Sequence, residues 1–400
     1  MLINSSSPQI LHKKYAIRFV ILLGVVSLFA DITYEGARSI TGPLLAILGA
    51  SAAVVGFVSG LGELVGYALR MVSGYLADRT QKYWLITILG FVINLLAVPL
   101  LALVTHWEWA AVLIVLERLG KAIRTPARDA MLSHAGEQMG MGWGFGLHQA
   151  LDQIGGMSGP LIIALVLYLK GSQDYRLGFA ILIVPALLAI ATLLTAKAFY
   201  PNPKQLSTKR IELQSQGIPK IFWIYWIGAL FVAAGFADYP LIAYHFQKNH
   251  ILSPAWIPIA YAIAMGVDGA MALPLGKLFD RYGFIVLIVV TFLAAGFAPL
   301  VFMGNFYVAI LGVIFWAIGM GAHDSLMRAV VGNMVSPDKR ASAYGIFNMG
   351  YGITWFIGSA VMGLLYDVSV PAVIIFIILL QLAAIPWFYF VQSKLKQLLT

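Results

Sequence analysis

The sequence contains no cysteine, and only 11% of its 400 residues are charged. The absence of cysteine excludes disulfide bonds, thiol catalysis and thiolate metal sites. The shortage of charge is the stronger constraint, because a soluble domain typically carries about 25% charged residues. With 60% hydrophobic residues and a mean hydropathy of +0.87, the chain cannot cover itself with polar groups. Composition therefore predicts a protein whose solvent is lipid.

Several catalytic and nucleotide-binding motifs are also missing. The sequence contains no His-Glu-x-x-His, no Gly-x-Ser-x-Gly and no Gly-x-x-x-x-Gly-Lys-Ser/Thr. The sequence therefore gives no support for transport driven by ATP hydrolysis or for zinc-dependent or serine-dependent hydrolysis. We expect no enzyme, no cofactor and no resident metal.

Long apolar runs fill most of the chain. A bilayer core of about 30 Å needs roughly 20 apolar residues per helix. The first run follows Lys13, Lys14 and Arg18, as in a signal peptide, but it continues past Asp31 to about Leu48, so we interpret it as an uncleaved helix. Twelve spans are predicted in an all-α membrane protein: 17–45, 52–76, 84–105, 109–127, 143–169, 176–198, 221–246, 256–279, 284–303, 306–331, 342–366 and 370–392.

The lysine and arginine residues predict the orientation of these spans. Of the 26, eighteen fall at one predicted membrane face, among them Arg124 and Arg128. Three, namely Lys170, Arg176 and Lys248, fall at the other face, and the remaining five lie inside helices. Because basic loops stay in the cytoplasm, we expect an inner-membrane protein with both termini cytoplasmic. The net charge of +9 is thus a topology signal, and no nucleic-acid partner is expected.

A polar, proline-marked and basic stretch divides the chain. It contains Tyr200-Pro-Asn-Pro and Lys209-Arg210. We predict that residues 200–220 form a cytoplasmic linker between one six-helix bundle, residues 1–199, and a second, residues 221–400.

The two predicted halves share an internal repeat. Gly74-Tyr-Leu-Ala-Asp-Arg recurs 202 positions later as Gly276-Lys-Leu-Phe-Asp-Arg, and Phe29-Ala-Asp recurs 207 positions later as Phe236-Ala-Asp. Phe145-Gly matches Tyr344-Gly at an offset of 199. Parallel repeats of this kind suit a substrate site midway between two pseudo-symmetric halves.

The segment Gly74-Tyr-Leu-Ala-Asp78-Arg79 resembles a motif of the major facilitator superfamily, Gly-x-Leu-Ala-Asp-Arg-x-Gly-Arg-Arg, with Gln81 and Tyr83 as departures. The resemblance covers essentially the whole chain. It implies two bundles of six helices around a small-molecule site, and we expect a monomer in the lipid bilayer. It also implies a cytoplasmic gate formed by Gly74, Asp78, Arg79, Gly276, Asp280 and Arg281.

The predicted fifth helix resembles the antiporter motif of the same superfamily, Gly-x8-Gly-x3-Gly-Pro-x2-Gly-Gly. The residues that match it are Gly146, Gly155, Gly159 and Pro160, whereas the final glycine pair is absent. The resemblance implies proton-driven export. The alternative is that these glycines only allow close helix packing.

Charged residues occur inside several predicted spans, where each costs about 2.5–3.5 kcal/mol on insertion scales. Asp31, Glu35 and Arg38 share one face of the first helix. With Glu63, the two carboxylates are our candidates for carrying protons, because a nearby arginine can load or discharge them. The alternative is that opposite charges pair to fix helix packing. The candidate cavity residues are Tyr34, Arg38, Arg118, Lys121, His148, Asp152, Asp238, Asp268 and Asp324.

These observations predict a secondary active transporter that moves a small organic solute by alternating access, with protons as the coupling partner and export as the direction. One alternative is a proton-coupled importer of a metabolite or siderophore. A second, from another class, is a membrane receptor or enzyme that does not transport.

Overall fold

The computed structural model describes residues 8–139, 141–170, 175–202, 218–327, 330–331, 334–335 and 340–399. Within these ranges every regular element is a helix and no strand occurs. The prediction of an all-α protein is therefore confirmed.

We call the described residues up to 202 the first part of the chain and those from 218 onward the second part. The first part contains seven α-helices and one short 3₁₀ turn. They are α1 (Pro8–Ile47), α2 (Ala52–Thr80), α3 (Tyr83–Leu100) with the short 3₁₀ turn η1 (Leu101–Leu103), α4 (Trp107–Met139), α5 (Met141–Lys170), α6 (Tyr175–Ile181) and α7 (Ile183–Phe199). Those of the second part are α8 (Lys220–Ala234), α9 (Tyr239–Lys248), α10 (Trp256–Tyr282), α11 (Phe284–Ala295), α12 (Phe297–Met303), α13 (Phe306–Gly321), the π-helical η3 (Ala322–Met327), α15 (Arg340–Val368) and α16 (Val370–Leu399).

Nine helical segments of the described residues are long and apolar enough to cross a membrane, and α10 is a tenth, bent by 42°. Three of the nine are interrupted spans, made of α6 with α7, α8 with α9, and α11 with α12. The helix α13 is apolar but shorter, at 16 residues. The remaining helix, α4, carries too much charge to read as an apolar span. These twelve segments correspond in order to the twelve predicted spans.

The helix α4 extends well beyond its predicted end at residue 127 and reaches Met139. The predicted end lies near Arg124, Pro126 and Arg128, because proline and charge normally stop a membrane helix. The helix continues because both arginines face a polar cavity inside the protein, described below, and because Pro126 is accommodated within the helix. The tertiary environment overrides the local signal at this point.

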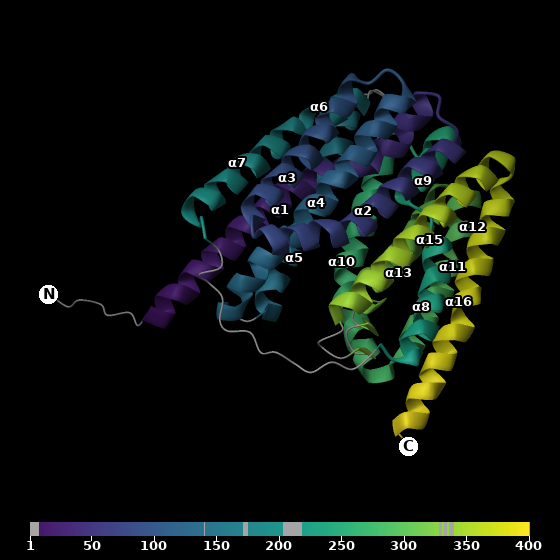
Figure 1. The fold of residues 1–400 in the computed structure, drawn as a ribbon. Helices are drawn as coiled ribbons and strands as arrows, with labels where there is room; N and C mark the ends of the chain where they lie inside the picture. Colours follow the sequence, from purple (N-terminus) through teal and green to yellow (C-terminus); the bar gives the residue numbers. More distant parts are fainter. Residues whose placement is uncertain are drawn as a thin grey trace.

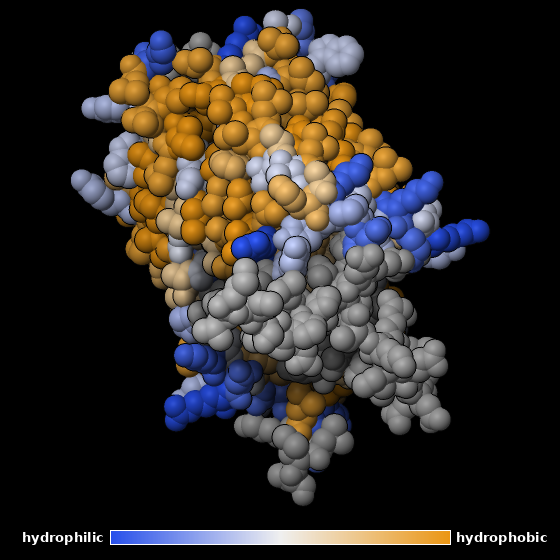
Figure 2. Space-filling view, turned by 90° about the vertical axis from the view of Figure 1, so that its left-hand side faces the viewer, coloured by the Kyte–Doolittle hydropathy of each residue, from blue (hydrophilic) through white to orange (hydrophobic). Residues whose placement is uncertain are grey.

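The helices of the two parts stand side by side. In Figure 1, α1 and α3 to α7 lie mainly on the left, α8 and α11 to α16 mainly on the right, and α2, α9 and α10 meet in the middle. In that view α1 starts at the lower left and α16 ends at the bottom, and we call this lower end of the molecule the terminal end. Figure 2 shows a broad hydrophobic face, with hydrophilic side chains gathered at its upper edge and in its lower part, as a lipid-embedded protein requires.

The opposite end, which we call the closed end, is where the two parts meet most tightly. A Cβ atom on Gly42 of α1 would collide with the backbone carbonyl of Pro240 in α9, and one on Gly56 of α2 would collide with that of Ser359 in α15. Only glycine permits such an approach of two backbones. The Asp367 carboxylate of α15 also accepts hydrogen bonds from the first two backbone N–H groups of α2, at 3.1 and 2.9 Å.

Candidate functional site: a charged cavity between the two parts

A cavity of about 890 Å³ lies between the two parts of the chain. Its lining runs from Arg38 and Glu63, near the closed end, to Arg128 and Asp129 of α4. The side chain of Asp129 is 42% exposed, so the cavity opens toward the terminal end. The volume lies within the usual range for small-molecule sites.

Most of the charge in the described lining comes from the first part of the chain. Helical spacing explains this, because Asp31, Glu35 and Arg38 lie at i, i+4 and i+7 of α1, and Lys121 and Arg124 lie one turn apart on α4. The first-part residues that line the cavity and carry charge are Asp31, Glu35, Arg38, Glu63, Arg70, Arg118, Lys121, Arg124, Arg128, Asp129 and Asp152. Within the described lining, the second part adds Asp268.

A network of ion pairs closes the inner end of the cavity. The Arg38 guanidinium lies 3.0 Å from a Glu63 carboxylate oxygen and 3.3 Å from one of Asp238. Arg118 reaches Glu63 at 3.6 Å and its neighbour Glu117 at 3.3 Å. Because Asp238 belongs to the second part, Arg38 joins the two parts. Its two carboxylate partners offset much of the cost of burying a guanidinium.

Asp238 is held where the seventh span breaks. The helix α8 ends at Ala234, and Asp238 is the residue before α9 begins. It is 2% exposed, and its Oδ2 atom accepts hydrogen bonds from the Trp355 indole at 3.0 Å and from the Ser359 hydroxyl at 2.9 Å. Asp238 lines a second, much smaller cavity of about 30 Å³, which shares Tyr34, Arg38, Glu63 and Arg118 with the large one. The ion pairs among Arg38, Glu63, Arg118 and Asp238, which we call the ion-pair layer, therefore separate the large cavity from the closed end.

Glu35 forms a second connection between the parts. Its Oε2 atom accepts a 2.5 Å hydrogen bond from the Tyr261 hydroxyl of α10, and its Oε1 atom lies 3.8 Å from the Lys121 ammonium. The same ammonium lies 3.9 Å from the centre of the Tyr34 ring, a distance typical of a cation–π contact.

Asp31 is the least paired of the buried carboxylates in α1. It is 6% exposed, its Oδ1 atom has no hydrogen-bond partner in the described part of the chain, and none of the described cations lies within 4 Å of it. Asp152 of α5 also has one unpartnered oxygen, while its other oxygen lies 3.3 Å from the His148 ring. The His148 ring is further hydrogen-bonded to the Ser27 hydroxyl at 2.9 Å.

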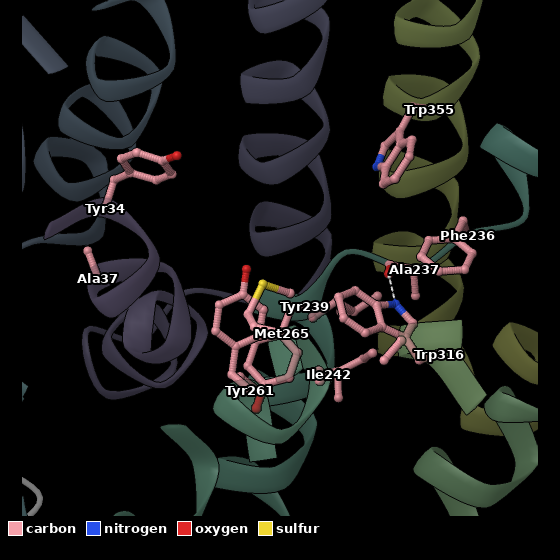
Figure 3. Packing of buried hydrophobic residues seen from close by; sticks show 14 of the residues in the cluster. Tyr34, Ala37, Phe236, Ala237, Tyr239, Ile242, Tyr261, Met265, Trp316 and Trp355 are labelled. Carbon is pink, nitrogen blue, oxygen red and sulfur yellow. Dashed lines mark hydrogen bonds between the residues drawn. The ribbon is translucent and has the colours of Figure 1, made fainter. Parts of the chain in front are cut away.

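The wall from the second part is mainly aromatic and sulfur-containing. Figure 3 shows Tyr34 on one side, with Tyr261, Met265 and Trp355 across from it. Asp268, the charged residue described in this wall, is contacted by the Gln153 amide of α5 at 3.5 Å. The wall residues are Tyr261, Met265, Asp268, Gly269, Met320, Gly321, Phe347, Asn348, Tyr351 and Trp355.

The predicted cavity residues are thus largely brought together. Tyr34, Arg38, Arg118, Lys121, His148, Asp152 and Asp268 line the large cavity, as do Asp31, Glu35 and Glu63, whereas Asp238 lies just beyond it. The side chain of Asp324 lies outside the described residues. Lining residues that the sequence did not mark as cavity candidates include Arg70, Arg124, Arg128, Asp129 and Tyr261. The sequence analysis places the two arginines of α4 at a membrane face, although the spacing of Lys121, Arg124 and Arg128, at i, i+3 and i+7, is a signal of one continuous helical face.

The predicted gate residues lie away from the cavity lining. Arg79, Asp280 and Arg281 are exposed, and they make no ion pair with the described side chains. Gly74 faces Pro126 of α4, at 3.4 Å from where its Cβ would stand, whereas the corresponding space beside Gly276 is open. The side chain of Asp78 lies outside the described residues, so its pairing stays a prediction.

The glycines of the antiporter-like motif pack α5 against α1. A Cβ on Gly155 would collide with the Leu28 carbonyl oxygen, and one on Gly159 with that of Ile32. The same added Cβ on Gly155 would lie 2.8 Å from the Cβ of Asp31. These glycines therefore hold the backbone of α5 directly against the turn that carries Asp31. Pro160 follows within α5, and the surroundings of Gly146 lie outside the described side chains.

Two helical parts around a charged central cavity define a membrane transporter rather than an enzyme. The family profile of the Major Facilitator Superfamily matches residues 23–322 and 236–398. The chain belongs to this superfamily, as its motifs indicated.

Relatives and solved structures agree with this assignment. An uncharacterized protein of Mycobacterium tuberculosis is 39% identical over 374 residues, which cover 92% of this chain and 91% of that protein. An uncharacterized MFS-type transporter of Methanocaldococcus jannaschii is 28% identical over 362 residues, 88% of this chain and 89% of that one.

Among solved structures, the nucleoside transporter NupG matches with a TM-score of 0.72 at 15% identity, over 94% of this chain and 99% of that one. A bacterial homolog of the human lysosomal transporter Spinster matches with a TM-score of 0.68, also at 15% identity, over 97% and 96% of the two chains. At these identities the likeness shows a shared fold alone.

Proposed function

We propose that this protein is a proton-coupled secondary transporter of a small organic solute, with Asp31 as the principal proton site. The observation that supports it is the position of Asp31, a buried carboxylate in the cavity wall with an unpartnered oxygen and no described cation within 4 Å. A carboxylate in such a place is costly when ionised, so it favours a bound proton during part of a transport cycle. Glu35 is the second candidate, because its Lys121 and Tyr261 contacts join the two parts.

Glu63 takes a different role in this proposal. It lies between Arg38 and Arg118, which balance its charge. We assign it to the ion-pair layer that closes the inner end of the cavity and that must rearrange for the site to face the other side.

The proposed direction is export, which the α5 glycines support through their resemblance to the antiporter motif. Import is the alternative. Export and import can be distinguished in vesicles of known protein orientation. They require pH gradients of opposite polarity for the solute to accumulate inside the vesicles.

The test uses purified protein in proteoliposomes, supplied with a mixture of cell metabolites and assayed by mass spectrometry with and without a pH gradient. We expect gradient-driven movement of at least one solute. Asp31→Asn should abolish the gradient-driven movement but leave downhill exchange, and Glu35→Gln should act in the same direction. Glu108→Gln is the matched control, because Glu108 is exposed in the first turn of α4.

Two results would contradict the assignment of Asp31. If Asp31→Asn still moves solute against its gradient, protons travel by another group. If exchange is lost together with gradient-driven movement in a folded variant, Asp31 binds substrate or holds the fold.

The orientation is part of the proposal, with both termini and residues 200–220 in the cytoplasm of a cell with an inner membrane. The natural lack of cysteine makes it directly testable. Ser207→Cys should resist an impermeant thiol reagent in intact cells, while Ser253→Cys, in an exposed position at the closed end, should react. The reverse pattern would invert the topology.

A further inference from the structure

Arg124 is a deeply buried cation of the cavity wall. Only 1% of the residue is exposed, and its Nε and Nη1 atoms have no hydrogen-bond partner in the described part of the chain. The guanidinium carbon lies 4.2 Å from the centre of the Phe91 ring and 5.6 Å from that of Tyr34. The faces of these rings attract the positive charge but do not satisfy its N–H donors.

The charge of Arg124 can be balanced only by an anion. A guanidinium does not lose its proton inside a protein. Asp31 and Asp152 each have an unpartnered oxygen, but a carboxylate can be neutralised by taking up a proton. Arg128, one turn away on α4, adds positive charge on the same face, although it is paired with Asp129 at 2.8 Å. The Arg124 guanidinium is therefore the group in this cluster that requires an anionic ligand.

Lys121 provides a second cation on the same face of α4, one turn before Arg124. Its ammonium lies 3.9 Å from the Tyr34 ring centre, and its contact with Glu35 is long, at 3.8 Å. Tyr34 thus lies between the two cations. Residues three apart on a helix are neighbours, so one carboxylate group can contact both side chains from the cavity.

The opposite wall has a different chemistry. Phe347 and Tyr351 stack with their rings 5.4 Å apart, and Tyr351 lies 5.6 Å from Trp355. Such a surface binds a flat apolar body through ring contacts and area burial.

We propose that the cavity binds small aromatic carboxylates, with the carboxylate held by Arg124 and Lys121 and the ring against Phe347, Tyr351 and Trp355. This assignment of a substrate class rests on the proposed transport function. It requires both a ring and a carboxylate in the ligand, because the proposed anion site lies on α4 and the proposed ring site on α15, both in the lining of one cavity.

The first experiment uses the unmodified protein in detergent and isothermal titration calorimetry. The probes are 1-naphthoate, its uncharged amide, 1-naphthylmethylammonium, tryptophan and acetate. We expect 1-naphthoate to bind at least tenfold more tightly than each of the others, because it alone combines a ring with an uncompensated negative charge. Equal binding of the amide or the ammonium compound, tighter binding of tryptophan, or no binding of 1-naphthoate would overturn the proposal.

The second experiment uses variants. Arg124→Gln should weaken 1-naphthoate binding at least tenfold while leaving the amide unchanged, and Arg124→Lys should restore part of the loss. Arg18→Gln, at an exposed position of α1, is the matched control and should bind as the natural protein does. If Arg124→Gln does not fold, as judged by size-exclusion chromatography, Lys121→Gln should show a smaller loss in the same assay. Unchanged 1-naphthoate binding in a folded Arg124→Gln variant would overturn the proposal.

The outcome is separable from that of the transport proposal. Gradient-driven solute movement in proteoliposomes without selective 1-naphthoate binding would reject the substrate class alone. Selective binding without any gradient-driven movement would reject proton coupling alone.

Discussion

The two parts of the chain share a sequence repeat, yet they contribute different chemistry to the cavity between them. Among the described lining residues, the first part supplies six basic and five acidic side chains, whereas the second supplies Asp268. The second part supplies instead Tyr261, Phe347, Tyr351 and Trp355. The repeat in the sequence therefore does not extend to the side chains that line the cavity. We infer that the first part handles charge, including the proposed proton, and that the second part handles the apolar body of the solute.

The largest effect is expected where the two parts are joined by charge. Arg38→Gln removes one of the two cationic partners of Glu63 and the described cationic partner of Asp238. Breaking a buried ion pair from one side costs about 3–5 kcal/mol, so thermal unfolding in detergent should occur at a clearly lower temperature, and transport should be lost. Arg79→Gln, on the exposed surface, should change stability by less than about 0.5 kcal/mol. An equally stable Arg38→Gln variant would show that the layer is not what joins the parts.

A glycine substitution at the closed end should act on conformation. In Gly42→Ala the new methyl group collides with backbone atoms of Pro240 and Tyr244. Overpacking of this kind costs about 1–3 kcal/mol, which would shift the balance between closed and open states about 5- to 150-fold. The measurement is the distance between spin labels on the two parts. Gly66→Ala is the control, because no atom lies within 4 Å of its added Cβ. Matching distances in the two variants would contradict the tight closure.

A smaller effect is expected from substitutions in the two walls of the cavity, which should change different kinetic parameters of transport. Phe347→Leu removes ring contact from the second-part wall without changing charge. An aromatic pair contributes about 0.5–1.5 kcal/mol, so we expect KM for a transported solute to rise about 2- to 13-fold. The pH-gradient dependence should stay. Asp31→Asn should show the opposite pattern, with coupling lost and exchange kept. If both variants change the same parameter, the division of labour between the walls is wrong.

The smallest effect concerns the predicted gate at the terminal end. Arg281 is exposed, and its guanidinium carbon lies 5.1 Å from the centre of the Tyr282 ring. Arg281→Gln should therefore change the free energy of unfolding by less than about 0.5 kcal/mol. If the repeat partners form a gate in another state of the cycle, transport should nevertheless slow while substrate affinity stays constant. The comparison of initial rate with equilibrium binding checks this. A loss of affinity instead would place Arg281 in the binding machinery.

The sequence was sufficient to predict the superfamily, the order of the membrane spans and most of the charged residues that line the cavity. Helical spacing of Asp31, Glu35 and Arg38 placed them on one face, and insertion cost marked them as candidates for the cavity that they line. It was insufficient for Arg124, because a charge beside a proline normally marks a helix end, and only the tertiary fold shows that α4 continues. It also could not identify partners. That Arg38 pairs with Asp238, exactly 200 positions away, depends on how the two parts are packed.

The backbone-to-backbone contacts of the closed end have a consequence for the speed of the cycle. Where Gly42 and Gly56 meet the opposite part, backbone lies directly against backbone, and the Phe57 ring beside Gly56 packs edge-on against Phe356, with ring centres 5.4 Å apart. The directional links at this end include the Asp367 carboxylate, which accepts from the first N–H groups of α2, and the Tyr244 hydroxyl, which donates to the Ala50 carbonyl at 3.2 Å. Contacts of such short range are lost after a small separation of the two surfaces, which favours abrupt switching over gradual loosening.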